Sequence, residues 1–301
     1  MKIFITGGSG FVGTDLSLYL LKKGHRVIAV GRSPSHKLDG NENFQYISAD
    51  TTEKGDWQNA LHKVDAAVNL AGINILRLWT DSYKAQIYDS RILTTRNLVE
   101  ALPDDKSVTL CSTSAAGYYG NRGDEILKEN ARPGDDFLAK VCIDWEKEAY
   151  QAEAKGIRVV TMRFGVVLGK SGGPIKKMLP AFKFFVGGPM GNGKHWFPWI
   201  HMDDLISAIL FILENREIEG PVNFCASEPV RNIDFAKALG NALNRPSFMT
   251  APAFMIRLIM GELGTSLLNS QRVSPDKLTK YGFKFQHPDI NSALSEILMA
   301  S

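Results

Sequence analysis

Three glycines near the amino terminus have a spacing that could bring the backbone close to a phosphate group. The segment 6–13 reads Thr-Gly-Gly-Ser-Gly-Phe-Val-Gly and directly follows a short β-rich run. A helical pattern of apolar residues starts within it, and a glycine-rich turn between strand and helix is the context of dinucleotide-binding loops. The free N–H groups and the dipole at the start of the helix would face a pyrophosphate. We expect these residues to contact the cofactor: Gly7, Gly8, Ser9, Gly10, Phe11, Val12 and Gly13.

The end of the next β-rich run distinguishes between the two nicotinamide dinucleotides. Residues 30–33 read Val-Gly-Arg-Ser, where an NAD-binding protein commonly carries an Asp or Glu for the ribose 2′-hydroxyl. Without a carboxylate nothing repels a 2′-phosphate, and the planar donor fork of Arg32 suits phosphate oxygens. Gly31 and Arg32 are therefore predicted cofactor contacts, and NADP is favoured over NAD. The alternative is that Arg32 is an ordinary solvated arginine.

Two further turns could also contact the cofactor. Asp50 ends the third β-rich run, where its carboxylate could accept from an adenine amino group or could equally cap the turn that follows. Residues 69–72 read Asn-Leu-Ala-Gly and close the fourth run. Their small side chains would let the backbone approach the cofactor ribose. The predicted contacts in these turns are Asp50, Leu70, Ala71 and Gly72.

The elements that must position these residues alternate between strands and helices. The strands are short, nearly continuous apolar runs, as expected when a parallel sheet is covered on both faces. The expected strands are 2–6, 26–30, 44–47, 66–70, 107–111 and 157–163, and the expected helices are 11–23, 57–62, 83–102 and 137–155. This order predicts an α/β fold, a Rossmann-type doubly wound parallel sheet, over residues 1–165.

The pattern loosens after Gly165. Glycine and proline cluster at 172–174 and 187–189, and the expected elements are helices at 203–214, 233–243 and 252–268 with a strand at 222–224. We interpret residues 166–301 as a smaller lobe on the substrate side, with some core elements continuing to about residue 245. Such a lobe would lie over the carboxyl edge of the sheet, where ligands bind in these folds.

Composition excludes several classes of function. The 301 residues are 44% hydrophobic and 22% charged, as in ordinary soluble proteins, and the formal net charge of +3 gives no reason to expect a nucleic acid or a membrane as partner. The glycines at 7–10 interrupt the first apolar run before a signal peptide could form, so we expect a cytoplasmic protein or one in an organelle matrix. Cys111, Cys142 and Cys225 are widely spaced, which predicts buried apolar residues and no metal site.

Three segments together resemble the extended short-chain dehydrogenase/reductase superfamily. They are the glycine loop, Asn-Leu-Ala-Gly at 69–72 and Ser-Thr-Ser-Ala-Ala-Gly-Tyr-Tyr-Gly at 112–120. Segments 165–169, 187–193, 199–204, 261–262 and 271–273 resemble its epimerase-like oxidoreductase branch, often labelled sugar nucleotide epimerases, which carries a short C-terminal domain, here at about 250–298. The resemblance implies an NADP-dependent enzyme for a small carbonyl or a sugar nucleotide, and a possible homodimer.

The sequence departs from the superfamily at the catalytic pair. The usual chemistry needs a Ser, a Tyr that exchanges a proton, and a Lys one helical turn after the Tyr. The most natural register puts Phe137 at the Tyr position and Val141 at the Lys position, and the only Tyr-x-x-x-Lys in the chain is Tyr19 with Lys23, on the first helix. This departure keeps a second class open, an NADP-binding sensor or scaffold that has lost turnover.

Other residues could replace the missing pair. Ser114 is the best match for the superfamily's serine, and Tyr118 or its neighbour Tyr119 could supply a phenol, although such tyrosines often only pack. His195 is a candidate general acid that could equally order its loop. Arg163 ends the sixth strand, next to the expected nicotinamide site. The predicted catalytic residues are Ser114, Tyr118 and His195, and Arg163 is a predicted cofactor contact.

Overall fold

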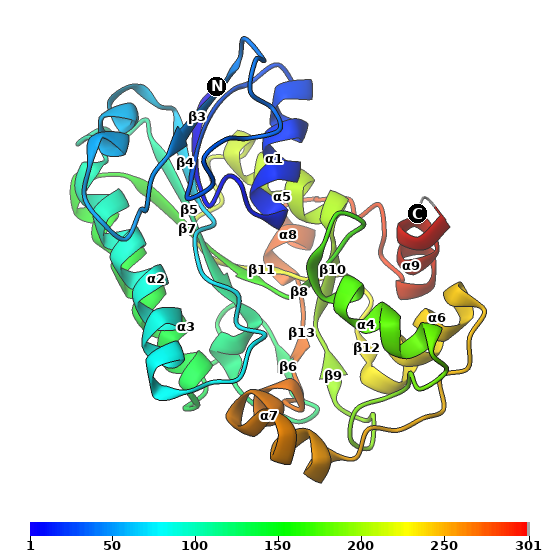
Figure 1. Cartoon of the computed structure of the whole chain (residues 1–301). Coiled ribbons are helices and arrows are strands. Elements are labelled where there is room, and N and C mark those ends of the chain that lie inside the picture. The colour runs from blue at the N-terminus through cyan, green and yellow to red at the C-terminus, as the bar shows by residue number, and fades with distance from the viewer. Residues whose placement is uncertain (300–301) are drawn as a thin grey trace.

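Seven parallel strands form the central sheet of the computed structural model, which describes residues 1–299 (Figure 1). The spatial order is β3-β2-β1-β4-β5-β7-β11, and every pairing is parallel. The strands are β1 (Lys2–Thr6), β2 (Arg26–Gly31), β3 (Phe44–Ser48), β4 (Ala66–Asn69), β5 (Thr109–Ala115), β7 (Arg158–Phe164) and β11 (Gly220–Phe224). The strand order reverses between β1 and β4, which is the point where such sheets bind ligands. The predicted Rossmann-type fold is confirmed.

Helices cover both faces of this sheet. On one face, α1 (Phe11–Lys22) and α5 (Met202–Glu214) share a core that includes Leu16 and Ile209. On the other face, Leu98 and Leu110 belong to a second core, which four helical elements cover. These are η1 (Asp56–Lys63), α2 (Asp81–Ala101), α3 (Phe137–Tyr150) and η3 (Gln151–Lys155). Two elements from beyond residue 165, α5 and β11, are therefore part of the sheet's layers.

The fifth strand lies further along the chain than its sequence pattern predicts. It spans Thr109–Ala115, whereas the apolar run suggested 107–111. Three of the four added residues are polar, yet Ser112 and Ser114 are buried in the sheet. Ser112 accepts a hydrogen bond of 3.1 Å from Asn69 on β4. At Ser112, a hydrogen bond to the neighbouring strand thus replaces the apolar pattern by which strands are recognised.

The second lobe has a core of its own around Trp199, Phe235 and Leu294. Its elements are β8 (Val166–Leu168), α4 (Gly173–Lys183), β9 (Trp196–Phe197), β10 (Trp199–His201), β12 (Val230–Arg231), α6 (Asn232–Leu243) and α9 (Ile290–Met299). Helix α4 was not expected, because its sequence begins with glycine and proline. Proline is tolerated in the first turn of a helix, where its missing N–H costs nothing.

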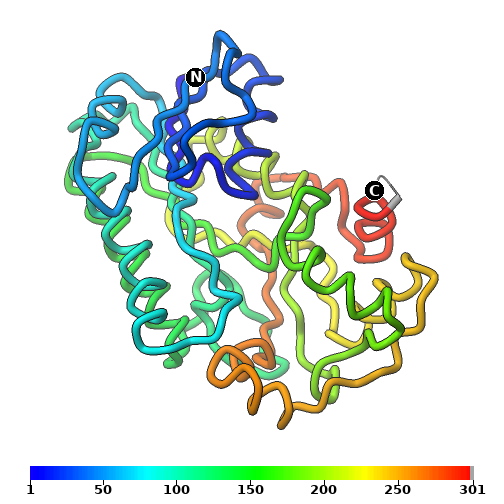
Figure 2. Tube along the Cα trace, viewed as in Figure 1, coloured from blue at the N-terminus to red at the C-terminus, as the bar shows by residue number. Residues whose placement is uncertain are grey.

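The chain between α6 and α9 returns to the first lobe. Figure 2 shows its orange segment passing below the sheet before the red end rejoins the second lobe. This return contains α7 (Ala253–Leu267), β13 (Arg272–Val273) and α8 (Asp276–Lys280); β13 pairs with β6 (Ile126–Leu127), which follows η2 (Ala116–Tyr119). Among residues 1–299, no helix has the combined length and hydrophobicity that a membrane span requires.

Candidate functional site

The glycine loop forms a cradle in which side chains have no room. Gly7 has a φ of 65°, which favours glycine. A Cβ on Gly13 would overlap the carbonyl oxygen of Gly7, and one on Gly8 would lie 2.5 Å from the Cβ of Ala29 on β2. The loop is therefore packed directly onto the neighbouring strand, and side chains are excluded at Gly7, Gly8 and Gly13.

The first turn of α1 has hydrogen-bond donors without a side-chain cap. Gly10 is the N-cap residue, and the first turn contains no acidic residue. The first N–H groups of a helix have no acceptor within the helix, so those of residues 11–13 face outward at the positive end of its dipole. Backbone amides in this arrangement fit the pyrophosphate of a dinucleotide.

A free cation lies beside this cradle. A Cβ on Gly31 would collide with the side chain of Ser9, so the end of β2 touches the glycine loop. Arg32 follows and is exposed. Its guanidinium has no hydrogen bond or ion pair within residues 1–299. The end of β2 thus presents a cation and no carboxylate.

Asp50 caps the turn that follows it. One carboxylate oxygen accepts from the Thr52 amide at 3.0 Å and from the Thr52 hydroxyl at 2.7 Å. Burial raises the pKa of Asp50, but these hydrogen bonds outweigh burial and the net shift is downward. The capping alternative is therefore the one that the structure describes, and the adenine contact stays a prediction.

The turn after β4 touches the glycine loop on one side and an arginine on the other. A Cβ on Gly7 would lie 2.8 Å from the carbonyl oxygen of Leu70. A Cβ on Gly72 would lie 3.0 Å from the guanidinium carbon of Arg91. Leu70, Ala71 and Gly72 are thus at the switch point of the sheet, as their predicted role requires.

Arg91 is not among the site residues predicted from the sequence, although its position on the helix indicates that it is buried. It lies four residues from the buried Ile87 and from the buried Thr95, so the helix brings a charged residue to its buried side. The guanidinium donates to the carbonyls of Ile87 at 2.9 Å and Ile73 at 3.2 Å, and no carboxylate pairs with it in residues 1–299. Burial lowers the pKa of Arg91, but a guanidinium stays charged in proteins.

Ser114 is buried near the end of β5. Its hydroxyl oxygen has no hydrogen-bond partner of good geometry among the described residues, although the thiol of Cys142 on α3 lies close to it. Burial raises the pKa of Cys142 to about 12. The thiol therefore stays protonated at neutral pH, which excludes it as a nucleophile. All three cysteines are unpaired and buried, as predicted.

Arg163, a predicted cofactor contact, is engaged within the protein in this structure. The guanidinium is 3% exposed and forms a two-point ion pair with Glu146 of α3, at 2.8 Å for each contact. It also donates to the Tyr119 hydroxyl at 3.0 Å and to the Glu129 carbonyl at 3.0 Å. Four of its five donors are used within the protein. Sequence position alone could not reveal that the side chain points toward α3.

The two tyrosines after β5 differ in environment. Tyr119 is fully buried and donates to Asn223 at 2.7 Å. Burial raises the pKa of Tyr119 to about 12, despite the nearby Arg163. Tyr118 is half-buried, with the Arg163 guanidinium 3.5 Å from its ring centroid. Tyr119 is thus a structural residue, and the catalytic role expected for Tyr118 stays a prediction.

Phe137 opens α3, where the superfamily's tyrosine is expected. Asp136 caps the helix by accepting from Ala139 at 2.9 Å. Trp79 meets the phenyl ring edge-on at 5.3 Å, and the Lys84 ammonium lies 4.5 Å from the ring centroid. Lys84 also pairs with Glu262 of α7 at 2.7 Å. Phe137 is therefore half-buried, with its ring between Trp79 and a lysine of α2.

His195 lies in the second lobe, away from these residues. It precedes β9 and lines a pocket of about 820 Å³. No hydrogen bond or ion pair within residues 1–299 joins it to Ser114 or Tyr118. Burial lowers the pKa of His195, so the ring is neutral at pH 7. The predicted catalytic residues thus fall into two groups.

Comparison with known proteins agrees with this geometry. The sequence pattern of the NAD dependent epimerase/dehydratase family matches residues 3–225. The chain belongs to this family. A domain of unknown function, DUF1731, matches residues 251–297, the segment that returns to the first lobe and ends in α9.

Relatives of this epimerase-family protein extend over its whole length. An Arabidopsis thaliana protein named epimerase family protein SDR39U1 homolog, chloroplastic, is 36% identical over 99% of this chain and 87% of its own. The crystal structure of human epimerase family protein SDR39U1 (isoform 2) with NADPH has a TM-score of 0.85 at 30% identity, and all of both chains is covered. The nucleoside-diphosphate sugar epimerase of Corynebacterium glutamicum has a TM-score of 0.78 at 34% identity, over 99% of this chain and 58% of that one.

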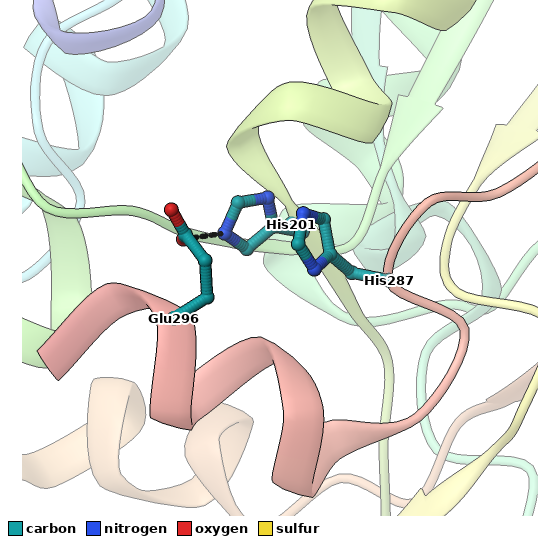
Figure 3. Close-up of side chains that lie close together, drawn as sticks. All are labelled: His201, His287 and Glu296. Carbon is teal, nitrogen blue, oxygen red and sulfur yellow. Dashed lines mark hydrogen bonds and ion pairs between the residues drawn. The ribbon is translucent and has the colours of Figure 1, made fainter. Parts of the chain in front are cut away.

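The DUF1731 segment of the epimerase-family protein is tied to the core through two motif residues. Asp204 is fully buried and accepts from the amides of Gln286 at 2.7 Å and His287 at 3.0 Å. His201 lies 3.1 Å from a carboxylate oxygen of Glu296 on α9 (Figure 3). The segment 199–204 that resembles the branch therefore holds the C-terminal domain in place.

His201, His287 and Glu296 are grouped as metal ligands often are, with their ligand atoms within 4.8 Å of one another. The hydrogen bonds argue against a metal. The Nδ1 of His201 accepts from the Asp203 amide at 3.2 Å, so the neutral ring carries its proton on Nε2 and donates to Glu296. A metal-bound imidazole needs the opposite arrangement, with its second nitrogen as a donor. The cluster is better explained as the cap of α5 joined to α9.

Proposed function

We propose that the protein is an NADP-dependent oxidoreductase or epimerase-like enzyme that acts on a small carbonyl or a sugar-nucleotide substrate. The observation that carries the proposal is the uncapped first turn of α1 next to the unpaired Arg32, with no carboxylate at the end of β2. The relatives support it, because one relative, matched over its full length, was crystallised with NADPH, and another, of which this chain covers 58%, is named a nucleoside-diphosphate sugar epimerase.

Different residues of this chain have different roles in the proposed reaction. Amides of residues 11–13 bind the pyrophosphate, Arg32 binds the 2′-phosphate, and the turn from Leu70 to Gly72 supports the ribose. The bound cofactor supplies or accepts the hydride. Ser114 has an unused buried hydroxyl and donates to the substrate oxygen, while Tyr118 exchanges the proton.

The test of the proposal is turnover. NADPH absorbance should fall with at least one carbonyl if the protein is a reductase. If it is an epimerase, a nucleotide sugar incubated with the oxidised cofactor should be converted to its epimer, which product analysis detects, with no net change in absorbance. Ser114→Ala should then lower kcat about 10²–10³-fold, the usual cost of removing one donor to a developing oxyanion, with little change in NADPH affinity. Tyr118→Phe should lower kcat and alter its pH profile.

One specific observation favours a second function, that of an NADP-binding sensor or scaffold without turnover. Phe137 and Val141 stand where the superfamily has its proton-transfer pair, and Phe137 is covered by Trp79. Saturable NADPH binding without turnover, with Ser114→Ala and Tyr118→Phe affecting only stability, would assign the protein to the class of NADP-binding sensors or scaffolds instead.

Arg91 is the proposed replacement for the missing lysine. It is a positioning residue: an unpaired cation against Gly72, which fixes the cofactor ribose and keeps positive charge beside it. Arg91→Met should weaken NADPH binding about 10- to 100-fold, because a hydrogen bond to a charged group contributes about 1.5–3 kcal/mol. Calorimetric titration measures this change.

Two control variants distinguish a role of Arg91 in NADPH binding from a purely structural role, in which Arg91 only holds the loop at Ile73. Arg91→Lys keeps the charge and should recover most of the NADPH affinity. Arg96→Met removes an exposed arginine of the same helix, paired with Glu148, and should leave NADPH binding unchanged. If Arg91→Met lowers only the melting temperature, Arg91 is a structural tie.

A further inference from the structure

The pocket beside His195 has no role in the cofactor site. It lies where four segments meet: the loop after η2, the loop before β9, β12, and α7 with the turn that follows it. These segments are close together near the lower end of the sheet in Figure 1. Its volume of about 820 Å³ is within the range of small-molecule sites. None of the residues that line it comes from the glycine loop or from β2.

The charges around the pocket are mostly positive. Lys194, Arg231 and Arg257 line it, with Asp124 as the one carboxylate. Asp124 is already engaged, because it accepts from the Trp196 indole at 2.7 Å and pairs with Arg231 at 3.0 Å. These contacts hold the pKa of Asp124 below its usual range. Two positive charges are thus left without an acidic partner in residues 1–299, those of Lys194 and Arg257.

The pocket wall is fixed by its own hydrogen bonds. The Lys194 amide donates to the Asn192 side chain at 2.9 Å, and the carbonyl of His195 accepts from the Asn232 amide at 2.9 Å. His195 is 8% exposed, and its Nε2 has no partner among the described residues. A neutral imidazole in this wall can donate one further hydrogen bond.

The pocket adjoins the segment that carries the candidate phenol. Ser270 lines it and donates to the Gly123 carbonyl at 2.7 Å, and the next residue, Gln271, donates to the Gly120 carbonyl at 3.0 Å. Gly120 directly follows the Tyr118–Tyr119 pair. A ligand held in the pocket by one end could therefore extend along this loop toward Ser114.

We propose that this pocket binds the phosphate or diphosphate group of the substrate, through Lys194 and Arg257. The inference rests on the proposed function, because it assigns the anionic end of the substrate of that same enzyme. Two uncompensated cations match the double negative charge of a phosphate monoester or diphosphate, whereas a carboxylate carries one charge. Arginine binds phosphate oxygens through a planar pair of donors, and lysine adds a point charge. Arg257 belongs to the DUF1731 match, which gives that domain a role in substrate selection.

Titration of the NADPH-saturated protein with pyrophosphate, inorganic phosphate and acetate tests the proposal. Saturating NADPH keeps these anions out of the glycine loop. If the substrate is a diphosphate, pyrophosphate should bind more tightly than phosphate. If the substrate is a phosphate monoester, phosphate should bind at least as tightly as pyrophosphate. Acetate should bind most weakly in either case. Lys194→Ala and Arg257→Ala should each weaken binding at least tenfold, while Lys147→Ala, an exposed lysine on α3, should not.

The failures of the two proposals are distinguishable. NADPH affinity should be the same in Arg257→Ala as in the unaltered chain, since Arg257 lies on α7 and lines a pocket to which no glycine-loop residue contributes. Pyrophosphate binding that disappears when NADPH is present, or that survives the double variant Lys194→Ala/Arg257→Ala, overturns the pocket proposal and leaves the cofactor site standing. If NADPH does not bind but pyrophosphate binds and is lost in the double variant, the pocket stands as an anion site and the proposed function fails.

Discussion

Glu146→Gln should lower the free energy of unfolding by about 3–5 kcal/mol, the usual cost of leaving one member of a buried ion pair without its partner. Glu146 and Arg163 are 7% and 3% exposed and meet through two contacts of 2.8 Å. The substitution leaves the guanidinium charged between α3 and β7 with no carboxylate to compensate it. Urea unfolding followed by tryptophan fluorescence gives the free energy.

The same helix offers a matched control. Glu148 pairs with Arg96 at the surface, so Glu148→Gln should cost about 0–1 kcal/mol. The double variant Glu146→Gln/Arg163→Met removes the stranded charge and should recover part of the loss. Equal small losses for Glu146→Gln and Glu148→Gln would contradict the view that the buried pair holds α3 against the sheet.

Arg32→Ala should weaken NADPH binding about 10- to 100-fold and change NADH binding little. The guanidinium is exposed beside the glycine loop and forms no hydrogen bond or ion pair with the residues that the structure describes, so it is available to a 2′-phosphate. Loss of a charge-assisted hydrogen bond costs about 1.5–3 kcal/mol, which corresponds to this range of affinity. NADH has no 2′-phosphate and provides the internal reference.

Arg26→Ala is the control for Arg32. Arg26 is an exposed arginine at the opposite end of β2, so its removal changes the net charge equally and should leave both affinities unchanged. An equal loss of NADPH and NADH affinity in Arg32→Ala would show that Arg32 supports the loop rather than the 2′-phosphate.

The fold and the shape of the glycine loop could be predicted because both depend on local sequence. Apolar runs mark the strands of a doubly covered parallel sheet, and the glycine loop is a continuous segment whose proposed binding needs only its backbone. The prediction weakened where polar residues are buried, as in the extension of β5 through Ser112 and Ser114. There the signal is a partner on another strand, Asn69, which no local pattern reveals.

The other half of the site depends on contacts between distant segments. Arg163 was assigned to the cofactor from its position at a strand end, but Glu146 draws the side chain toward α3. Arg91 reaches the turn at Gly72 only because α2 packs against the sheet. The pocket combines Lys194 with Arg257, which are 63 positions apart in the printed numbering, and Asp124 from the first lobe. Such clusters of residues form only when distant segments pack together. The sequence therefore predicts His195 among the catalytic residues, whereas in the structure it lies in this pocket.

Calorimetric titration of the unaltered protein with NADPH and with NADH tests the central claim most directly. We predict saturable binding of one NADPH per chain, at least about tenfold tighter than NADH, from the charge-assisted contact with the 2′-phosphate. Absence of heat and of thermal stabilisation with both dinucleotides would contradict the assignment of the glycine loop, and tighter binding of NADH than of NADPH would contradict the role of Arg32.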